Sequence, residues 1–241
     1  DSLVRPAAVE HQRKRWTRLA DTWEFQGAAG LSKVVEAVLD EARFDENTVA
    51  VDLGSGTGQL SLPLAKKVSK VWAVDISQAM LDLLIDNAKS DGLENIETMA
   101  ASIESIDFPA ESLDLIVTNY VFHHLLDTDK ERIVRKSAKW LKPGGQLVIG
   151  DMMFGRGADS RDREIIRSKV VALAKKGPAG WWRIAKNLWR FSVRVQERPV
   201  RIDVWESFLQ SAGYADITSR PIVEEAAVVS GTKPLQKTTN N

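Results

Sequence analysis

The sequence contains no cysteine, which excludes disulfide bonds, zinc sites built on thiolates and cysteine nucleophiles. It also has no excess of either charge, because Lys and Arg number 33 and Asp and Glu also number 33. Proteins that neutralise a nucleic-acid backbone carry a basic excess, so we expect no nucleic-acid partner. No apolar run approaches the roughly 18 residues that a membrane-spanning helix requires. These absences favour a soluble, cytoplasmic protein.

What is present is a regular alternation of two patterns from residue 48 onward. Short β-branched runs alternate with segments of helical periodicity, which predicts a doubly wound, mostly parallel seven-stranded sheet with helices on both faces. Strands are expected at 48–53, 70–75, 95–100, 113–119, 146–151, 214–219 and 222–230, and helices at 59–68, 77–90, 129–140 and 202–212. The last two strands are joined only by Arg220-Pro221, a link so short that the strands must pair antiparallel.

The alternation also divides the chain into segments. Residues 48–155 and 202–231 are expected to form the core. N-terminal helices in residues 1–47 would supply a packing helix and a lid, and residues 156–201 a helical insertion after the fifth strand. Residues 232–241 form a polar tail.

A glycine-rich turn follows the first predicted strand. Residues 49–58 read VAVDLGSGTG, so Gly54, Gly56 and Gly58 lie between a hydrophobic run and a predicted helix. Glycines let a ligand approach bare backbone at a helix N-terminus, where a phosphate or carboxylate is favoured. Asp75 ends the second strand 17 residues after Gly58 and is placed to accept hydrogen bonds from ribose hydroxyls. Together these features predict a nucleoside site.

The spacing of the glycines indicates which kind of nucleoside ligand the site binds. A dinucleotide site has G-x-G-x-x-G, whereas Asp52 and the three glycines form D-x-G-x-G-x-G. This pattern closely resembles the signature of class I S-adenosylmethionine-dependent methyltransferases. Four further segments resemble that family's ribose-binding turn, adenine-binding turn, fourth-strand motif and post-helix turn, namely residues 74–77, 101–104, 114–125 and 141–145.

The resemblance implies a Rossmann-like fold, S-adenosylmethionine as cofactor and a cofactor site built from the motif residues. The glycine loop would contact the methionine portion, and Asp52 would support the loop and the cofactor's ammonium. Ser102 stands where the family usually has Asp against the adenine amino group; without charge assistance we expect weaker binding. The implied cofactor residues are Asp52, Gly54, Ser55, Gly56, Gly58, Asp75, Ile76, Ser102, Ile103 and Asn119.

Few catalytic side chains are needed for methyl transfer, because the protein mainly holds the acceptor and excludes water. A base helps when the acceptor carries a proton. The fourth strand delivers Asn119 and Tyr120 to the carboxyl edge of the sheet, where we expect them to line the transfer site. His123 and His124 follow as candidate bases, or alternatively as packing or backbone-bonding residues. No third ligand has a useful spacing, so we expect no metal site.

The predicted insertion is locally basic, although the net charge of the whole chain is zero. Residues 156–201 contain 13 Lys or Arg against four Asp or Glu, with Trp181, Trp182 and Trp189 among them. Three interpretations stay open: a substrate lid, weak membrane-surface association through residues 181–191, or a patch for an anionic substrate.

These features favour methyl transfer to a small molecule, which we expect to be a lipophilic or aromatic metabolite methylated on oxygen or carbon. One alternative is a catalytically silent paralogue that binds the cofactor and acts as a partner or regulatory protein. Another is a methyltransferase that acts on RNA or lipid through the basic insertion. The sequence leaves the oligomeric state open.

Overall fold

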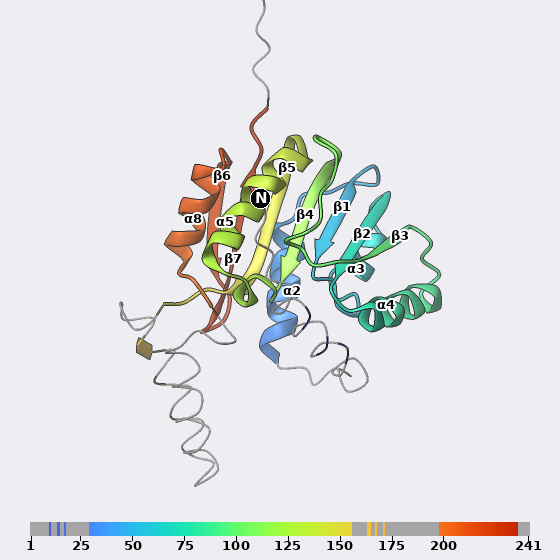
Figure 1. Cartoon of the computed structure of the whole chain (residues 1–241), viewed down its shortest axis with the longest axis horizontal. Helices are drawn as coiled ribbons and strands as arrows, with labels where there is room; N and C mark the ends of the chain where they lie inside the picture. The colour runs from blue at the N-terminus through green and yellow to red at the C-terminus, as the bar shows by residue number, and fades with distance from the viewer. Residues whose placement is uncertain are drawn as a thin grey trace, which may run out of the picture.

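The computed structural model describes residues 29–155 and 198–235, together with the single residues 10, 14, 17, 163, 164, 167 and 171. Seven strands form one sheet (Figure 1). They are β1 (Val49–Leu53), β2 (Lys70–Asp75), β3 (Ile96–Ala100), β4 (Leu113–Asn119), β5 (Leu141–Met152), β6 (Ala215–Pro221) and β7 (Ala226–Thr232). The helices are α2 (Ala29–Glu41), α3 (Ser61–Ala65), α4 (Gln78–Ser90), α5 (Asp127–Trp140) and α8 (Ile202–Ser211), with a 3-10 helix η1 (Phe122–His124).

The strand order is β3-β2-β1-β4-β5-β7-β6, and the first five strands in this order are parallel. β7 runs antiparallel to both of its neighbours, β5 and β6. The predicted doubly wound sheet with an antiparallel final pair is therefore confirmed. The central strands are buried on both faces, as their continuous apolar runs require.

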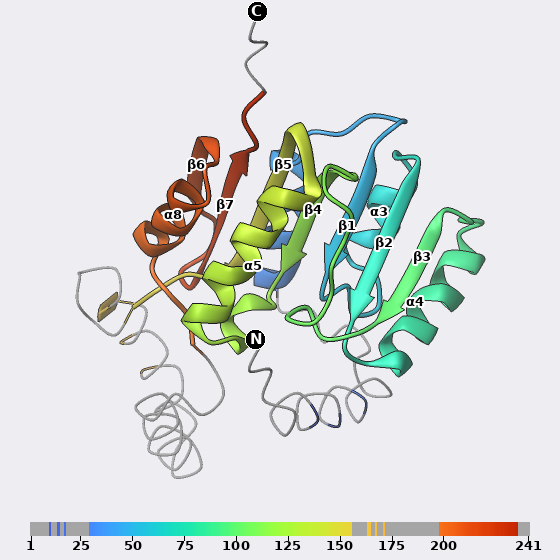
Figure 2. The ribbon, with the colours of Figure 1, turned by 45° about the horizontal axis from the view of Figure 1, so that its top comes forward.

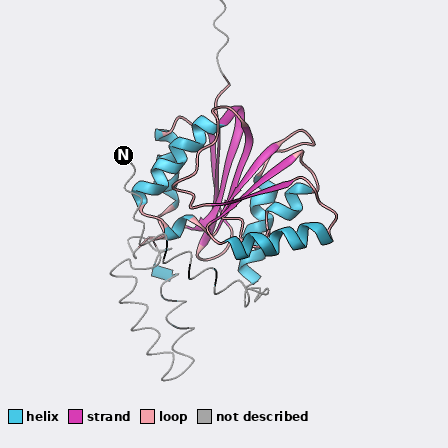
Figure 3. Cartoon of the chain, turned by 45° about the vertical axis from the view of Figure 1, so that its right-hand side comes forward, coloured by secondary structure: helices cyan, strands magenta, loops and turns pink. Residues whose placement is uncertain are grey.

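Helices cover both faces of the sheet (Figure 3). Alternate strand side chains pack with α5 and α8 on one face, where Ile133 and Trp205 are almost fully buried. The other side chains pack with α2, α3 and α4, as Val38 and Leu84 illustrate. Figure 2 shows α5 and α8 together over the β4, β5 and β7 side of the sheet. Burial of these two apolar layers supplies the main driving force for folding.

The turn between the last two strands does not lie at Arg220-Pro221, where it was predicted. β6 continues through Arg220 and Pro221, which pair with Val228 and Ala227, and residues 222–225 make the turn. β6 is an edge strand, and an edge strand tolerates a proline because one side of it needs no backbone donor. The antiparallel pairing is as predicted.

The predicted turn at residues 143–145 is part of β5 rather than a separate turn before it. Leu141 already pairs with Leu113, and the register then shifts before Gln146 pairs with Leu115. Within the shift, the Gly144 N–H donates to the Lys233 carbonyl at 2.8 Å. The glycines therefore make an irregularity in the strand, which starts five residues earlier than predicted.

The outlying segments are described only in part. α2 packs on the sheet, as expected of a packing helix. Most of the predicted N-terminal lid and residues 181–191 of the insertion lie outside the described residues. No helix in the described part of the chain is long and apolar enough to cross a membrane.

Close packing of α2 on the sheet depends on Gly150 in β5. A Cβ atom there would lie 2.5 Å from Val38 Cγ2 and 2.9 Å from Val34 Cγ1. We expect Gly150→Ala to lower the free energy of unfolding by about 1–3 kcal/mol, because the helix must move away. Gly30→Ala is the control: among the described residues its new methyl would meet only Val223, at 3.9 Å, so it should be neutral or stabilising. Urea unfolding of both variants tests this; equal midpoints would contradict it.

Candidate functional site

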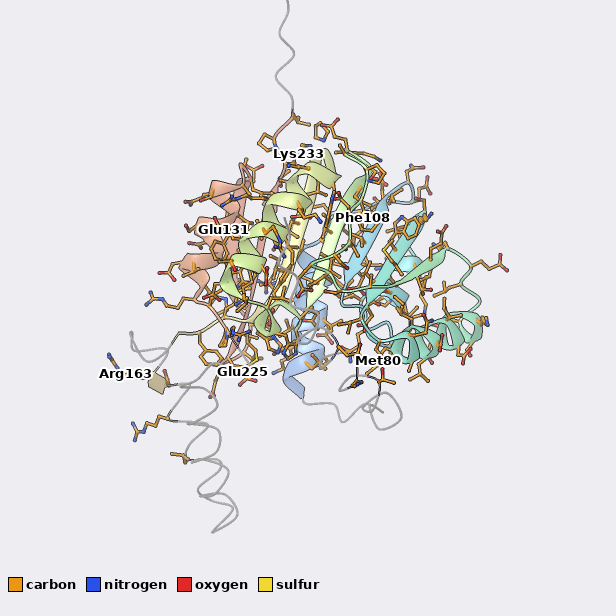
Figure 4. The ribbon with its side chains drawn as sticks, in the orientation of Figure 1. Met80, Phe108, Glu131, Arg163, Glu225 and Lys233 are labelled. Carbon is orange, nitrogen blue, oxygen red and sulfur yellow. The ribbon has the colours of Figure 1, made fainter. Side chains whose placement is uncertain are left out.

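The candidate site lies where the strand order reverses, between the carboxyl ends of β1 and β4. In open α/β sheets this reversal creates a crevice for ligands. The segments that leave the two strands touch, since a Cβ atom on Gly54 would lie 2.2 Å from Val121 Cγ2. In Figure 4, Met80 and Glu225 lie toward this edge of the sheet and Lys233 lies at the opposite edge.

The glycine loop after β1 has the conformation that its sequence predicts. Gly54 has a φ of +79°, and its N–H and that of Ser55 both donate to the Val74 carbonyl, at 2.7 and 2.9 Å. Any larger residue at position 54 would place its Cβ atom against the Val121 side chain, so this position requires glycine. Gly56 differs, because it has a φ of +52° and, apart from its chain neighbours, no atom of the described residues lies within 4 Å of the place of a Cβ. Gly56 therefore presents bare backbone to open space.

The predicted helix after the loop is shorter than expected. α3 covers only Ser61–Ala65, although backbone bonds continue the helical pattern from Gly58 to Val68. Pro63 has no backbone N–H, so it cannot donate one of the hydrogen bonds between successive turns of the helix. The helical turns therefore begin at the glycine loop, and a preference for an anion there stays a prediction.

Asp75 joins the glycine loop to the start of α4. Its Oδ2 accepts from the Gly56 N–H at 3.0 Å, and its Oδ1 accepts from the Ser77 N–H at 2.8 Å. Ser77 in turn caps α4 through the Met80 N–H, and Ile76 lies between the two. Burial raises the pKa of Asp75. The structure thus brings Asp75 against the glycine loop, as predicted.

Asp52 lies beneath the glycine loop and is only 1% exposed. Its Oδ2 accepts from the Ser61 hydroxyl at 2.7 Å, which ties β1 to α3. Burial raises the pKa of Asp52 to about 7; the Ser61 bond opposes the shift and the charge of Asp75 adds to it. This bond joins β1 to the helix that follows the loop, and the predicted support of the loop and of the cofactor's ammonium by Asp52 stays a prediction.

Ser102 lies in the turn after β3, next to Asp75. The Ala101 N–H donates to the Asp75 carbonyl at 2.9 Å, and the Ser102 hydroxyl donates to the Glu104 carboxylate. The structure adds a carboxylate beside Ser102, and the weaker cofactor binding expected from a serine at this position stays a prediction. Sequence reasoning missed Glu104, although an acidic residue two positions after Ser102 was a signal. The Ile103 side chain packs in the core, which leaves only its backbone for a ligand.

Two buried polar atoms at this edge have no partner among the described residues. They are the Ser55 hydroxyl oxygen in the glycine loop and the Asn119 Oδ1 atom at the end of β4. Leaving such atoms unsatisfied costs roughly 1–3 kcal/mol each. Both belong to the predicted cofactor site, so a polar ligand there would meet unsatisfied groups.

His123 and Asp151 form a buried pair at the ends of β4 and β5. His123 Nδ1 lies 2.6 Å from Asp151 Oδ1, and the His123 N–H donates to the other carboxylate oxygen at 3.0 Å. Their side chains are 7% and 1% exposed. A carboxylate at Nδ1 favours the tautomer with its proton there, which leaves Nε2 as the acceptor. The pair is thus compatible with either predicted role, base or backbone-bonding residue.

Two further predicted catalytic residues, Tyr120 and His124, lie next to this pair. Tyr120 has a φ of +55°, and its ring meets that of His123 edge-on at 6.2 Å. Burial, and then the carboxylates of Glu225 and Asp151, raise the pKa of Tyr120 above its usual range, so the phenol stays protonated. His124 stacks at a tilt on His123, with ring centroids 3.9 Å apart. The described residues hold no cluster of three metal-ligating side chains.

An apolar cluster lies at the end of β5, close to the point where the chain re-enters the described part at Arg198. Met152 and Phe154 form a small buried cluster with Tyr120. Where the chain returns, the Arg198 N–H donates to the His123 carbonyl at 2.6 Å. The buried Lys130 ammonium donates to the Arg198 carbonyl. The returning segment is therefore held directly beside the His123–Asp151 pair.

Comparison with known proteins points to one family. The profile of a methyltransferase domain matches residues 50–145. An uncharacterized methyltransferase of Geobacillus thermodenitrificans is 28% identical over 149 residues, 62% of this chain and 63% of that protein. Phosphoethanolamine N-methyltransferase 3 of Arabidopsis thaliana is 29% identical over 119 residues, 48% of this chain and 24% of that protein. The chain thus spans less than two thirds of these relatives.

The fold is also found in solved structures. The structure of DhpI in its complex with SAH superposes with a TM-score of 0.67 and 14% identity, over 95% of this chain and 98% of DhpI. At this level of identity the match establishes a shared fold.

The buried charge of Asp52 should make stability depend on pH. Between its unfolded pKa of 3.8 and its folded pKa of about 7, the unfolded chain has lost the proton that the folded chain keeps. The free energy of unfolding therefore falls as pH rises through this window. Asp52→Asn should remove about 2–4 kcal/mol of this fall, measured by urea unfolding from pH 4 to 8.

The matched control for this experiment is Asp86→Asn, which removes a carboxylate whose side chain is 74% exposed. It should leave the pH profile of the wild type unchanged. A profile that Asp52→Asn does not flatten would show that Asp52 titrates in the folded protein as it does in the unfolded chain.

Proposed function

We propose that the protein transfers a methyl group from S-adenosylmethionine to a small-molecule acceptor; residues 50–145 match a methyltransferase domain, and the sheet has the class I, Rossmann-like strand order. The family match and the sheet topology confirm the resemblance seen in the sequence. The observation that carries the proposal is the assembly of the Gly56 backbone and the Asp75 carboxylate at one crevice.

The residues present fit this cofactor. Asp75 offers a carboxylate to the ribose hydroxyls, and Gly56 offers open backbone to the methionine portion. The unpartnered Ser55 hydroxyl and Asn119 Oδ1 can bond the cofactor's polar groups, with Ile76 and Gly58 completing the loop walls. Asp52, beneath the loop, favours a cationic group above it. The cofactor would supply a methyl group already activated by the sulfonium charge.

The His123–Asp151 pair supports an acceptor that loses a proton on methylation. As that proton leaves the acceptor, Nε2 of His123 receives it, and the buried Asp151 carboxylate stabilises the resulting imidazolium. The protonated Tyr120 phenol can donate to the acceptor beside it. A hydroxyl, a phenol or an ammonium all satisfy this requirement.

The acceptor is proposed to be small and largely apolar, because Met152 and Phe154 face the same cluster as Tyr120. The Thr17 hydroxyl lies 3.3 Å from the Ser77 hydroxyl, which supports an N-terminal lid over this edge. The Arabidopsis relative carries the name phosphoethanolamine N-methyltransferase, so a small polar amino alcohol is the second candidate, in contrast to the apolar acceptor that the Met152–Phe154 cluster favours. A lipid-facing or substrate-covering role of residues 181–191 remains a proposal, as does the cytoplasmic location.

Cofactor binding is the first test. We expect S-adenosylmethionine and S-adenosylhomocysteine to bind with micromolar affinity in calorimetric titrations. Asp75→Asn should weaken both by about 10- to 100-fold, because the ribose loses its charged acceptor. Asp82→Asn, an exposed carboxylate seven residues further on, should bind like the wild type. If neither ligand binds the wild-type protein, the proposed function is wrong.

The base can be tested once an acceptor is found by screening phenols and amino alcohols with radiolabelled S-adenosylmethionine. His123→Gln should lower kcat by about 100-fold or more with little change in KM, because only proton removal is lost. His124→Gln is the matched control and should lower kcat much less. Equal turnover by both variants would assign His123 a purely structural role.

A further inference from the structure

Lys130 on α5 is a buried charged residue that has no part in the proposed methyl transfer. It is 0% exposed. Its ammonium lies 2.8 Å from Asp127 Oδ1, one turn earlier on the helix, and the Asp127 side chain is 35% exposed. Water therefore solvates the carboxylate in part, and the cost of burying the ion pair falls mainly on Lys130.

Stability alone does not account for this lysine. Removing an ammonium from water is unfavourable, and a well-packed apolar side chain of similar volume is often at least as stable in such a position. Groups that lower stability are tolerated where they serve binding or catalysis. The role of Lys130 is therefore to be sought in what its ammonium contacts.

The Lys130 ammonium holds the segment that leads into α8. It donates to the Arg198 carbonyl. Pro199 follows, and a residue before proline is restricted to extended backbone, so this carbonyl has little freedom to turn away. Val200 is buried in the same core cluster as Trp205. The Arg198 backbone is thus fixed by packing on one side and by the ammonium on the other.

The N–H of Arg198 bonds the proposed base. It donates to the His123 carbonyl at 2.6 Å. The His123 N–H and Nδ1 both bond the Asp151 carboxylate. His123 lies in η1, which is only three residues long, so the bonds of this helix do little to fix it. Asp151 therefore holds one side of His123, and Arg198 holds the other.

We infer that Lys130 is a positioning residue, which keeps the His123 ring in one orientation by holding the Arg198 backbone against the His123 carbonyl. The inference rests on the proposed function, in which His123 is the base. A base must present one nitrogen to the acceptor in a fixed direction. Lys130 supplies this constraint from α5 without touching the acceptor or the ring.

Nuclear magnetic resonance of the imidazole nitrogens tests the inference on the full chain, and it needs no acceptor. The chain has three histidines, so the signals that disappear in His123→Gln belong to His123. The wild type should show one narrow set of these signals, with the proton on Nδ1.

Lys130→Met should release the ring while the fold remains stable. The His123 signals should broaden by about twofold or more, or split, because the ring then exchanges between orientations. The urea midpoint should equal or exceed that of the wild type, because methionine fills a similar volume and the Asp127 carboxylate left behind is partly solvated.

Two further variants separate positioning from stability. Asp127→Asn keeps an acceptor for Lys130 but removes its counter-charge, so the urea midpoint should fall while the His123 signals stay narrow. Lys139→Met replaces an exposed lysine of the same helix. It is the control and should change neither measurement.

Narrow, single His123 signals in Lys130→Met would overturn the inference. A lowered urea midpoint in that variant would do the same, because Lys130 would then have a structural role. Equal broadening in Asp127→Asn would also contradict it, since the ring would follow stability alone. The proposed function fails by a different measurement, the absence of S-adenosylhomocysteine binding in calorimetry, so the two failures are distinguishable.

Discussion

The Asp75 carboxylate is the interaction on which the candidate site depends, because three loops from three different strands meet at this residue. One oxygen holds the glycine loop at Gly56, and the other holds the cap of α4 at Ser77. Its carbonyl fixes the turn after β3 through Ala101. The crevice therefore has its shape before a ligand arrives, and binding need not spend free energy on ordering these loops.

This preorganisation has a cost in buried charge. Asp52 and Asp75 both have raised pKa values because burial disfavours their carboxylates, and the charge of Asp75 adds to the shift of Asp52. Natural proteins tolerate such destabilising groups where they serve binding or catalysis. A cationic ligand above the loop would offset the unfavourable charge, so affinity and stability are expected to be coupled through the same two residues.

Much of this arrangement could be predicted because it depends on local pattern. The limits of β2 and β4 follow directly from β-branched runs, and Gly54, Gly56 and Asp75 follow from spacing. The features that were missed depend on neighbours in space. The position of the β6–β7 turn depends on β6 being an edge strand. The strut from Ser61 to Asp52 and the bond from Ser102 to Glu104 depend on side-chain direction, which periodicity does not encode.

The basic insertion begins and ends at nearly the same point in the fold. The chain leaves β5 just after Asp151, and on its return Arg198 is bonded to His123, the partner of Asp151. Because closing a loop costs little more when the loop grows longer, residues between these two anchors can be exchanged without disturbing the sheet. The length and sequence between Gly155 and Arg198 can therefore change during evolution while the sheet that holds the glycine loop and Asp75 stays the same.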